Sequence, residues 1–119
     1  MKIQKIKELL EARVLCGEGN LEGEVHSACG CDMMSDVLAY VKDQAVLLTG
    51  LCNPQVVRTA MMMDMRCIVF VRGKSPSADI IALAEDAGIV ILSTDKRMYV
   101  ACGVLYEAGL HGGEGAKNG

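Results

Sequence analysis

A short apolar run, then a polar turn, then an amphipathic segment recurs along this chain, and this pattern constrains its fold most. The apolar runs are residues 45–49, 66–71 and 89–92. Near-continuous apolar strands are typical of parallel sheets buried on both faces, and parallel strands need a crossover helix between them. The pattern therefore predicts an α/β fold, a three-layer α/β/α sandwich with a mostly parallel sheet of four to five strands.

Helix start and stop signals divide the rest of the chain. Asn53 followed by Pro54 indicates a helix start, because proline lacks only an N–H that would have no helical partner there. Asp32 is expected to cap the second helix, and Gly88 to end the fourth. We expect helices at 3–12, 33–41 and 54–64, one from Ser75 or Ser77 to 87, and one from 93–95 to about 108, with two further strands at 13–16 and 24–31 whose direction stays open.

The 119 residues fit a single domain, which we place at residues 1–109. Residues 110–119 are polar and glycine-rich, and we expect them to form a disordered tail. Every apolar run is much shorter than the roughly 20 residues that span a bilayer, and the N-terminus lacks the apolar core of a secretion signal. We therefore expect a cytoplasmic protein without a membrane partner, whose six cysteines are reduced thiols.

The charge and aromatic content argue against nucleic acid as a partner. The net charge is -3, and the chain has three tyrosines, one phenylalanine and no tryptophan. Binding to phosphates needs clustered lysine and arginine, and binding to single strands needs aromatic platforms.

Polar residues follow each expected strand, at the edge where the carboxyl ends of parallel strands meet. Helix N-termini at such an edge present free N–H groups, which favour anions. The candidate ligand-binding residues are Gly30, Asp32, Ser35, Thr49, Gly50, Asn53, Lys74, Ser75, Thr94 and Asp95. The alternative is that the side chains among them only cap helices, each stabilising by about 1 kcal/mol.

No complete set of catalytic groups is present. Gly73-Lys74-Ser75 resembles the end of a phosphate-binding loop, but Ile68 stands where that loop needs its first glycine. A nucleophilic cysteine would need a positioned base, and the chain has only two histidines. We expect a protein that is not an enzyme and needs no cofactor.

A cluster of cysteine and histidine leaves metal binding open as an alternative. The candidate ligands of zinc or an iron–sulfur cluster are His26, Cys29, Cys31 and Cys52. No Cys-x-x-Cys pair is present, and free cysteine is commonly buried as a small apolar group, so no metal is the favoured interpretation.

Four methionines lie within five positions, Met61, Met62, Met63 and Met65. They cannot all face one core. We expect an interface with a second subunit formed by Met61, Met62 and Met65.

Four segments resemble the DRTGG domain family, which is similar to the N-terminal domain of HPr kinase/phosphorylase. The segments are 30–39, Leu48-Thr49-Gly50, 53–57 and 92–95, and the resemblance covers about residues 3–109. It implies an α/β fold, a homodimer and a regulatory or ligand-sensing role. The literal Asp-Arg-Thr-Gly-Gly string is absent, with Thr49-Gly50 as its counterpart. The phosphate-binding loop of the kinase is absent as well.

Two functions from different classes remain open. The first is a non-catalytic regulatory domain that dimerises and binds a nucleotide or another small anion at the strand ends. The second is a protein-interaction or assembly subunit, which the resemblance associates with redox or hydrogenase systems. A Cys/His metal-binding protein is a third alternative.

Overall fold

The computed structural model describes residues 1–40 and 44–112. Its elements alternate between helix and strand for most of the chain. They are α1 (Ile3–Leu10), β1 (Arg13–Cys16), η1 (Glu18–Asn20), β2 (Ser27–Gly30), α2 (Met34–Tyr40), β3 (Ala45–Thr49), α3 (Pro54–Met62), β4 (Cys67–Phe70), α4 (Ala78–Asp86), β5 (Val90–Ser93) and α5 (Met98–Glu107).

The strands form one five-stranded sheet in the order β1-β5-β4-β3-β2. Strands β2 to β5 are parallel, and each pairs with its neighbour in the chain. Strand β1 pairs antiparallel with β5 and has an irregular register between Val14 and Cys16. The mostly parallel sheet that the sequence predicts is confirmed, and the direction of the first two strands is now known.

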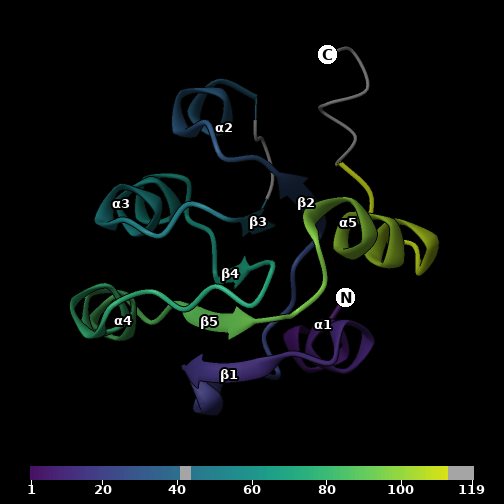
Figure 1. Ribbon diagram of the computed structural model, residues 1–119, viewed down its shortest axis with the longest axis horizontal. Helices are drawn as coiled ribbons and strands as arrows, with labels where there is room; N and C mark the ends of the chain where they lie inside the picture. Colours follow the sequence, from purple (N-terminus) through teal and green to yellow (C-terminus); the bar gives the residue numbers. More distant parts are fainter. Residues whose placement is uncertain (41–43, 113–119) are drawn as a thin grey trace.

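Helices cover both faces of the sheet (Figure 1). Helices α2, α3 and α4 lie on one face, because right-handed crossovers between strands that advance in one direction all fall on the same side. Helices α1 and α5 cover the other face. Alternate residues of β4 enter the two cores: Ile68 and Phe70 join the α2–α4 core, while Val69 joins the α1–α5 core.

The expected start of α3 and end of α4 agree with the structure, whereas the expected start of α5 does not. Asn53 caps α3 by accepting a hydrogen bond from the Gln55 N–H at 2.9 Å, and Gly88 follows α4 with φ of 73°. Helix α5 starts at Met98, later than expected, because Ser93 belongs to β5 and the Thr94 hydroxyl donates to the Leu10 carbonyl at 2.7 Å. The expected end of the second helix at Val41 lies outside the described residues.

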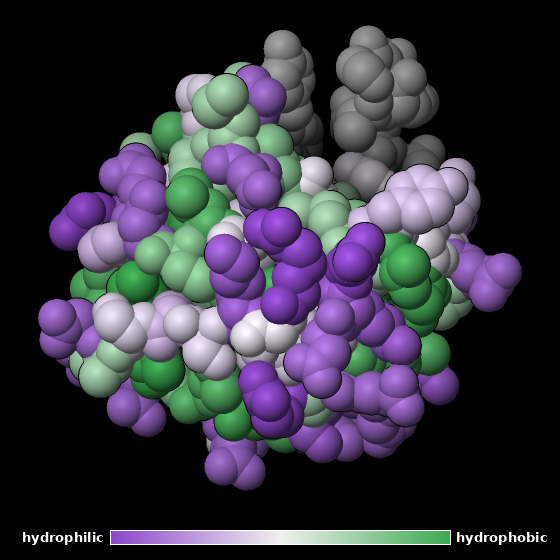
Figure 2. All heavy atoms as spheres, viewed as in Figure 1, coloured by the Kyte–Doolittle hydropathy of each residue, from purple (hydrophilic) through white to green (hydrophobic). Residues whose placement is uncertain are grey.

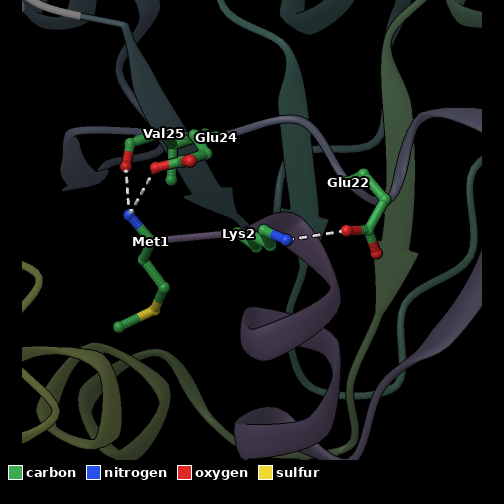
Figure 3. A network of polar contacts seen from close by, with 5 residues as sticks. All are labelled: Met1, Lys2, Glu22, Glu24 and Val25. Carbon is green, nitrogen blue, oxygen red and sulfur yellow. Dashed lines mark hydrogen bonds and ion pairs between the residues drawn. The ribbon is translucent and has the colours of Figure 1, made fainter.

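The first residues of the chain are tied to the segment that leads into β2 (Figure 3). The Met1 amino group donates to the Val25 carbonyl at 2.8 Å, and Lys2 Nζ lies 2.8 Å from Glu22 Oε1. The backbone of Ile3 adds a hydrogen bond to Gly23. These contacts hold the start of α1 beside the connection between β1 and β2.

The expected start of a disordered tail at residue 110 is wrong. Leu110 is buried in the α1–α5 core, and the His111 carbonyl accepts a hydrogen bond from the Ala28 N–H at 2.8 Å. The His111 ring also stacks on Tyr106, with ring centroids 4.1 Å apart. One apolar residue and one backbone bond thus attach the chain to the outer edge of β2, while residues 113–119 lie outside the described part.

Candidate functional site

The turns that follow β2, β3, β4 and β5 lie side by side along the carboxyl edge of the sheet. Backbone hydrogen bonds continue the strand pairing into them: the Val71 N–H donates to Thr49, and the Gly73 N–H donates to Thr94. The Arg72 N–H donates to the Lys96 carbonyl at 2.8 Å. We call this row of turns the carboxyl rim, residues 31–33, 49–53, 71–75 and 94–97.

Asp32 joins the first two turns of the carboxyl rim. Its Oδ1 accepts one hydrogen bond from the Thr49 hydroxyl and one from the Gly50 N–H, each at 2.8 Å. Thr49 is fully buried, and its hydroxyl oxygen also accepts from the Leu51 N–H at 3.1 Å. The expectation that Asp32 caps α2 is wrong, because its carboxylate is bonded to the next strand end.

These contacts also hold the Asp32 side chain in its charged form. The hydrogen bond from the Gly50 N–H lowers the pKa of the Asp32 carboxyl, partial burial opposes this, and the Thr49 hydroxyl lowers it again. The positive charges of Arg72 and Lys74 lower the pKa further. The Asp32 carboxylate is therefore negatively charged and links two turns through hydrogen bonds, with the cations Arg72 and Lys74 nearby.

Arg72 is a rim residue that the sequence analysis missed. It has left-handed backbone with φ of 61°, and its Nη2 lies 3.1 Å from the position that a Cβ on Gly50 would occupy. The guanidinium thus lies across Gly50, where a side chain at that position would push it aside. A basic Arg72-Gly73-Lys74 triplet directly after a buried strand was the signal that could have found it.

Arg72 and Lys74 are exposed cations without an ion-pair partner in residues 1–40 and 44–112. Neighbouring Lys96, by contrast, pairs with Glu11 at 3.2 Å. Unpaired exposed arginine and lysine at the ends of parallel strands form a positive feature that suits phosphate or carboxylate groups.

The structure removes two of the sequence candidates from a ligand site. Thr94 is buried, and its hydroxyl donates to Leu10 and accepts from the Lys96 N–H, so it faces α1. Gly30 lies against α5, where an added Cβ would come 2.5 Å from Cys102 Sγ. Both residues serve packing between layers.

The other candidate residues lie on or beside the rim, and their side chains make different contacts. Asn53 is used as the cap of α3. Asp95 is exposed, with Oδ1 3.1 Å from the place of a Cβ on Gly73. Ser35 and Ser75 are exposed and make no side-chain hydrogen bond within the described residues.

The carboxyl rim is an open surface. Strands β2 to β5 follow each other without a reversal of order, so the parallel part lacks the crevice that a reversal creates in doubly wound sheets. A hollow of about 500 Å³ lies instead at the opposite edge, between residues 19–23 and the turns after α3 and α4. In Figure 2 hydrophilic side chains gather near the middle of the view, with apolar surface to both sides. A ligand on the rim would be bound mainly by charge.

Within residues 1–40 and 44–112, the thiols are not grouped with other side chains that could bind a metal ion. No three His, Cys, Asp or Glu side chains are grouped to hold a metal ion in the part of the chain that the structure describes. Burial raises the pKa of Cys29 to about 11, and burial also raises the pKa of the Cys52 thiol while Lys74 opposes the shift. Neutral thiols of this kind behave as small apolar groups.

The Met-rich segment is divided between core and surface. Met61 and Met62 are exposed at the end of α3, as expected for at least part of the cluster. Met65 is buried in the α2–α4 core, so its assignment to an interface is wrong. Residue 65 lies two positions before the first residue of β4 and is buried like the strand residues that follow.

Fold and rim together define a class: a small α/β domain with a mostly parallel sheet, whose strand ends present exposed cations. The chain belongs to the DRTGG domain family, whose pattern matches residues 5–108. The resemblance seen in the sequence is thereby confirmed. No curated protein sequence matches the chain.

A solved structure of a pyrophosphatase regulatory region contains the same fold. It contains the CBS and DRTGG domains of the regulatory region of Clostridium perfringens pyrophosphatase, complexed with the activator diadenosine tetraphosphate. The TM-score is 0.69 at 16% identity, over 87% of this chain and 45% of that one. The present chain thus spans less than half the length of this neighbour. No helix in residues 1–40 and 44–112 is long and apolar enough to cross a membrane.

Proposed function

We propose that this chain is a non-catalytic regulatory domain that forms a dimer and senses a nucleotide or another small anion. It would act in the cytoplasm, where its six cysteines stay as free thiols. The observation that carries the proposal is the pair of exposed cations, Arg72 and Lys74, without an ion-pair partner in the described residues.

The chemistry of the rim favours polyphosphate over a neutral ligand. The Arg72 guanidinium can donate two parallel hydrogen bonds to one phosphate, and Lys74 adds a second positive charge. Asp32 is bonded to Thr49 and Gly50, so its oxygen Oδ1 is engaged within the protein. The neighbour of known structure is a regulatory region complexed with diadenosine tetraphosphate, a nucleotide with a long phosphate chain.

A thermal-shift series tests the anion site. The probes are AMP, ATP, diadenosine tetraphosphate and inorganic pyrophosphate, each up to millimolar concentration. We expect the polyphosphates to raise the melting temperature, and the effect to fall as salt screens the rim. The Arg72→Gln/Lys74→Gln double variant should bind at least about tenfold more weakly, a loss of about 1.4 kcal/mol.

The matched control removes two cations that do not belong to the rim, in Lys5→Gln/Arg58→Gln. Both side chains are exposed, on α1 and α3. Equal weakening by the two double variants would show a general effect of net charge and would reject the site. Absence of stabilisation by all four probes would reject an anion-sensing role.

A second candidate is an assembly module, and the exposed Met61 and Met62 favour it. Unbranched methionine side chains adapt to varied partner surfaces. Met33, which is also exposed, precedes the neighbouring helix α2. This candidate predicts that Met61→Lys/Met62→Lys lowers the association state of the chain.

A further inference from the structure

The solvent face of α5 is apolar over its whole length. Tyr99 is 90% exposed, Tyr106 63% and Val100 50%. No charged residue occurs between Arg97, which precedes the helix, and Glu107 at its last position. A surface helix normally carries charged residues on its outer face, so this helix has the composition of one that is covered on both sides.

Gly103 lies in the middle of this face and makes it locally flat. A Cβ built on Gly103 meets no atom within 4 Å, so the packing of the chain does not exclude a side chain at that position. Glycine inside a helix costs about 1 kcal/mol relative to alanine. A glycine at this position would allow the backbone of a second helix to approach closely.

An apolar hollow lies beside the C-terminal half of α5. It measures about 270 Å³ and lies between β2, the helix and the segment after it. Tyr106 and Cys102 line it from the helix, and Ala28 and Leu110 line it from below. The stacking of Tyr106 on His111 fixes one wall. The hollow has room for an aromatic side chain.

The residues of α5 are arranged so that the helix can pair with a second copy of itself. In an antiparallel pair centred between residues 102 and 103, Tyr99 of one helix lies opposite Tyr106 of the other. The same centre brings Arg97, at one end, near Glu107 of the second copy. Neither charge has an ion-pair partner in the described part of its own chain. A parallel pair would set like charges side by side.

We infer that a second copy of this chain packs on α5 around a two-fold axis near Gly103, with the two helices antiparallel. Tyr99 of each protomer enters the hollow beside Tyr106 of the other. Aromatic side chains that fill a pocket near the centre of an interface contribute most to its affinity. This inference rests on the dimerisation in the proposed function and assigns it to α5, in place of the Met-rich end of α3.

Sedimentation equilibrium of the full chain, from about 1 µM to about 500 µM, tests the inference. We expect the wild-type chain to dimerise within this range. Tyr99→Glu should weaken association at least about tenfold, because the aromatic anchor is lost and a charge enters an apolar contact. Tyr99 is almost fully exposed in the single chain, so circular dichroism should show an unchanged fold. Met61→Lys/Met62→Lys is the control and should leave the dimer intact.

Charge reversal provides an independent test of the antiparallel arrangement. Arg97→Glu and Glu107→Arg should each weaken the dimer, because each sets like charges opposite one another. The double variant should restore it.

Three outcomes of these experiments would overturn the inference. A wild-type chain that is monomeric throughout rejects dimerisation and α5 together. A dimer that Tyr99→Glu leaves unchanged, or that Met61→Lys/Met62→Lys dissociates instead, rejects α5 alone. If the double charge reversal does not restore the affinity of the dimer, the antiparallel pairing is rejected. The thermal-shift series tests anion binding separately in every case.

Discussion

Asp32 fastens two strand ends with a single carboxylate oxygen. Because its hydrogen bonds to Thr49 and Gly50 form only in the folded chain, the pKa of Asp32 is lower there than in the unfolded chain. A lowered pKa means that the charged group stabilises the fold at pH values above the unfolded pKa. This stability is lost as the pH falls through the folded pKa.

The Asp32→Ala variant should therefore be less stable at pH 7 by about 1 kcal/mol, which is below the roughly 1.5–3 kcal/mol usual for bonds to a charged group because Asp32 is exposed. The difference from wild type should shrink as the pH falls below about 4. Urea unfolding at pH 7 and at pH 3 measures it. Asp86→Ala is the control, since Asp86 is exposed and makes no side-chain hydrogen bond within the described residues. A loss that is the same at both pH values would contradict the role of the charge.

At this scale the sequence places the right turns together but does not identify every residue that matters. The choice of Asp32, Thr49 and Gly50 followed from the expected strand ends, and the structure joins them by hydrogen bonds. Arg72 was missed because it follows a strand and does not precede a helix, so no capping rule applies to it. Its position over Gly50 depends on a left-handed backbone that the sequence does not announce.

Helix starts show the same limit at the scale of elements. Asn53 and Ser77 both occupy N-cap positions, but only Asn53 makes the capping hydrogen bond with its side chain. Asp32 and Thr94 also look like caps in the sequence, yet they bond across the chain. Ser, Thr and Asp side chains can satisfy either a local or a distant partner, and spacing along the chain does not distinguish the two. The strands were easier to predict, because short continuous apolar runs between turn residues are typical of a parallel sheet covered on both faces.

The two capping positions offer a matched pair for measurement. We expect Asn53→Ala to lower the free energy of unfolding by about 1 kcal/mol, because the Gln55 N–H loses its partner. Ser77→Ala should change it by a few tenths of a kcal/mol at most, since no capping bond is lost. Urea denaturation of both variants measures the difference. Equal effects would mean that the bond seen at Asn53 contributes nothing to α3.

For the whole molecule, the sequence predicts the layers of helices and sheet. It does not predict which surfaces of those layers stay exposed. The parallel repeat implies that all turns after the strands share one edge, as observed. It does not imply the strand order. The order matters because strands β2 to β5 follow one another without a reversal, so this edge has no crevice and is an open rim. Likewise, the interface was expected from a run of methionines, whereas α5 carries no charged residue from Met98 to Tyr106. Which apolar residues are left over depends on how much of each helix the sheet covers.

The contact between β2 and α5 connects the rim to the proposed dimer face. Gly30 ends β2 directly beneath α5, and a Cβ there would come 2.5 Å from Cys102 Sγ and 3.2 Å from Met98 Sδ. Gly30→Ala should therefore displace the Cys102 and Met98 side chains and lower the free energy of unfolding by about 1 kcal/mol. Gly19→Ala is the control, because nothing lies within 4 Å of its added Cβ.

A double-mutant cycle shows whether the cost at Gly30 arises from this contact. Removing Sγ by Cys102→Ala frees the space that the new methyl group needs, so the two substitutions together should cost less than the sum of their separate effects. We expect a coupling of at least about 0.5 kcal/mol from urea denaturation of the four chains. Purely additive costs would mean that β2 and α5 do not meet at this point, and the apolar hollow beside Tyr106 would then lose one of its walls.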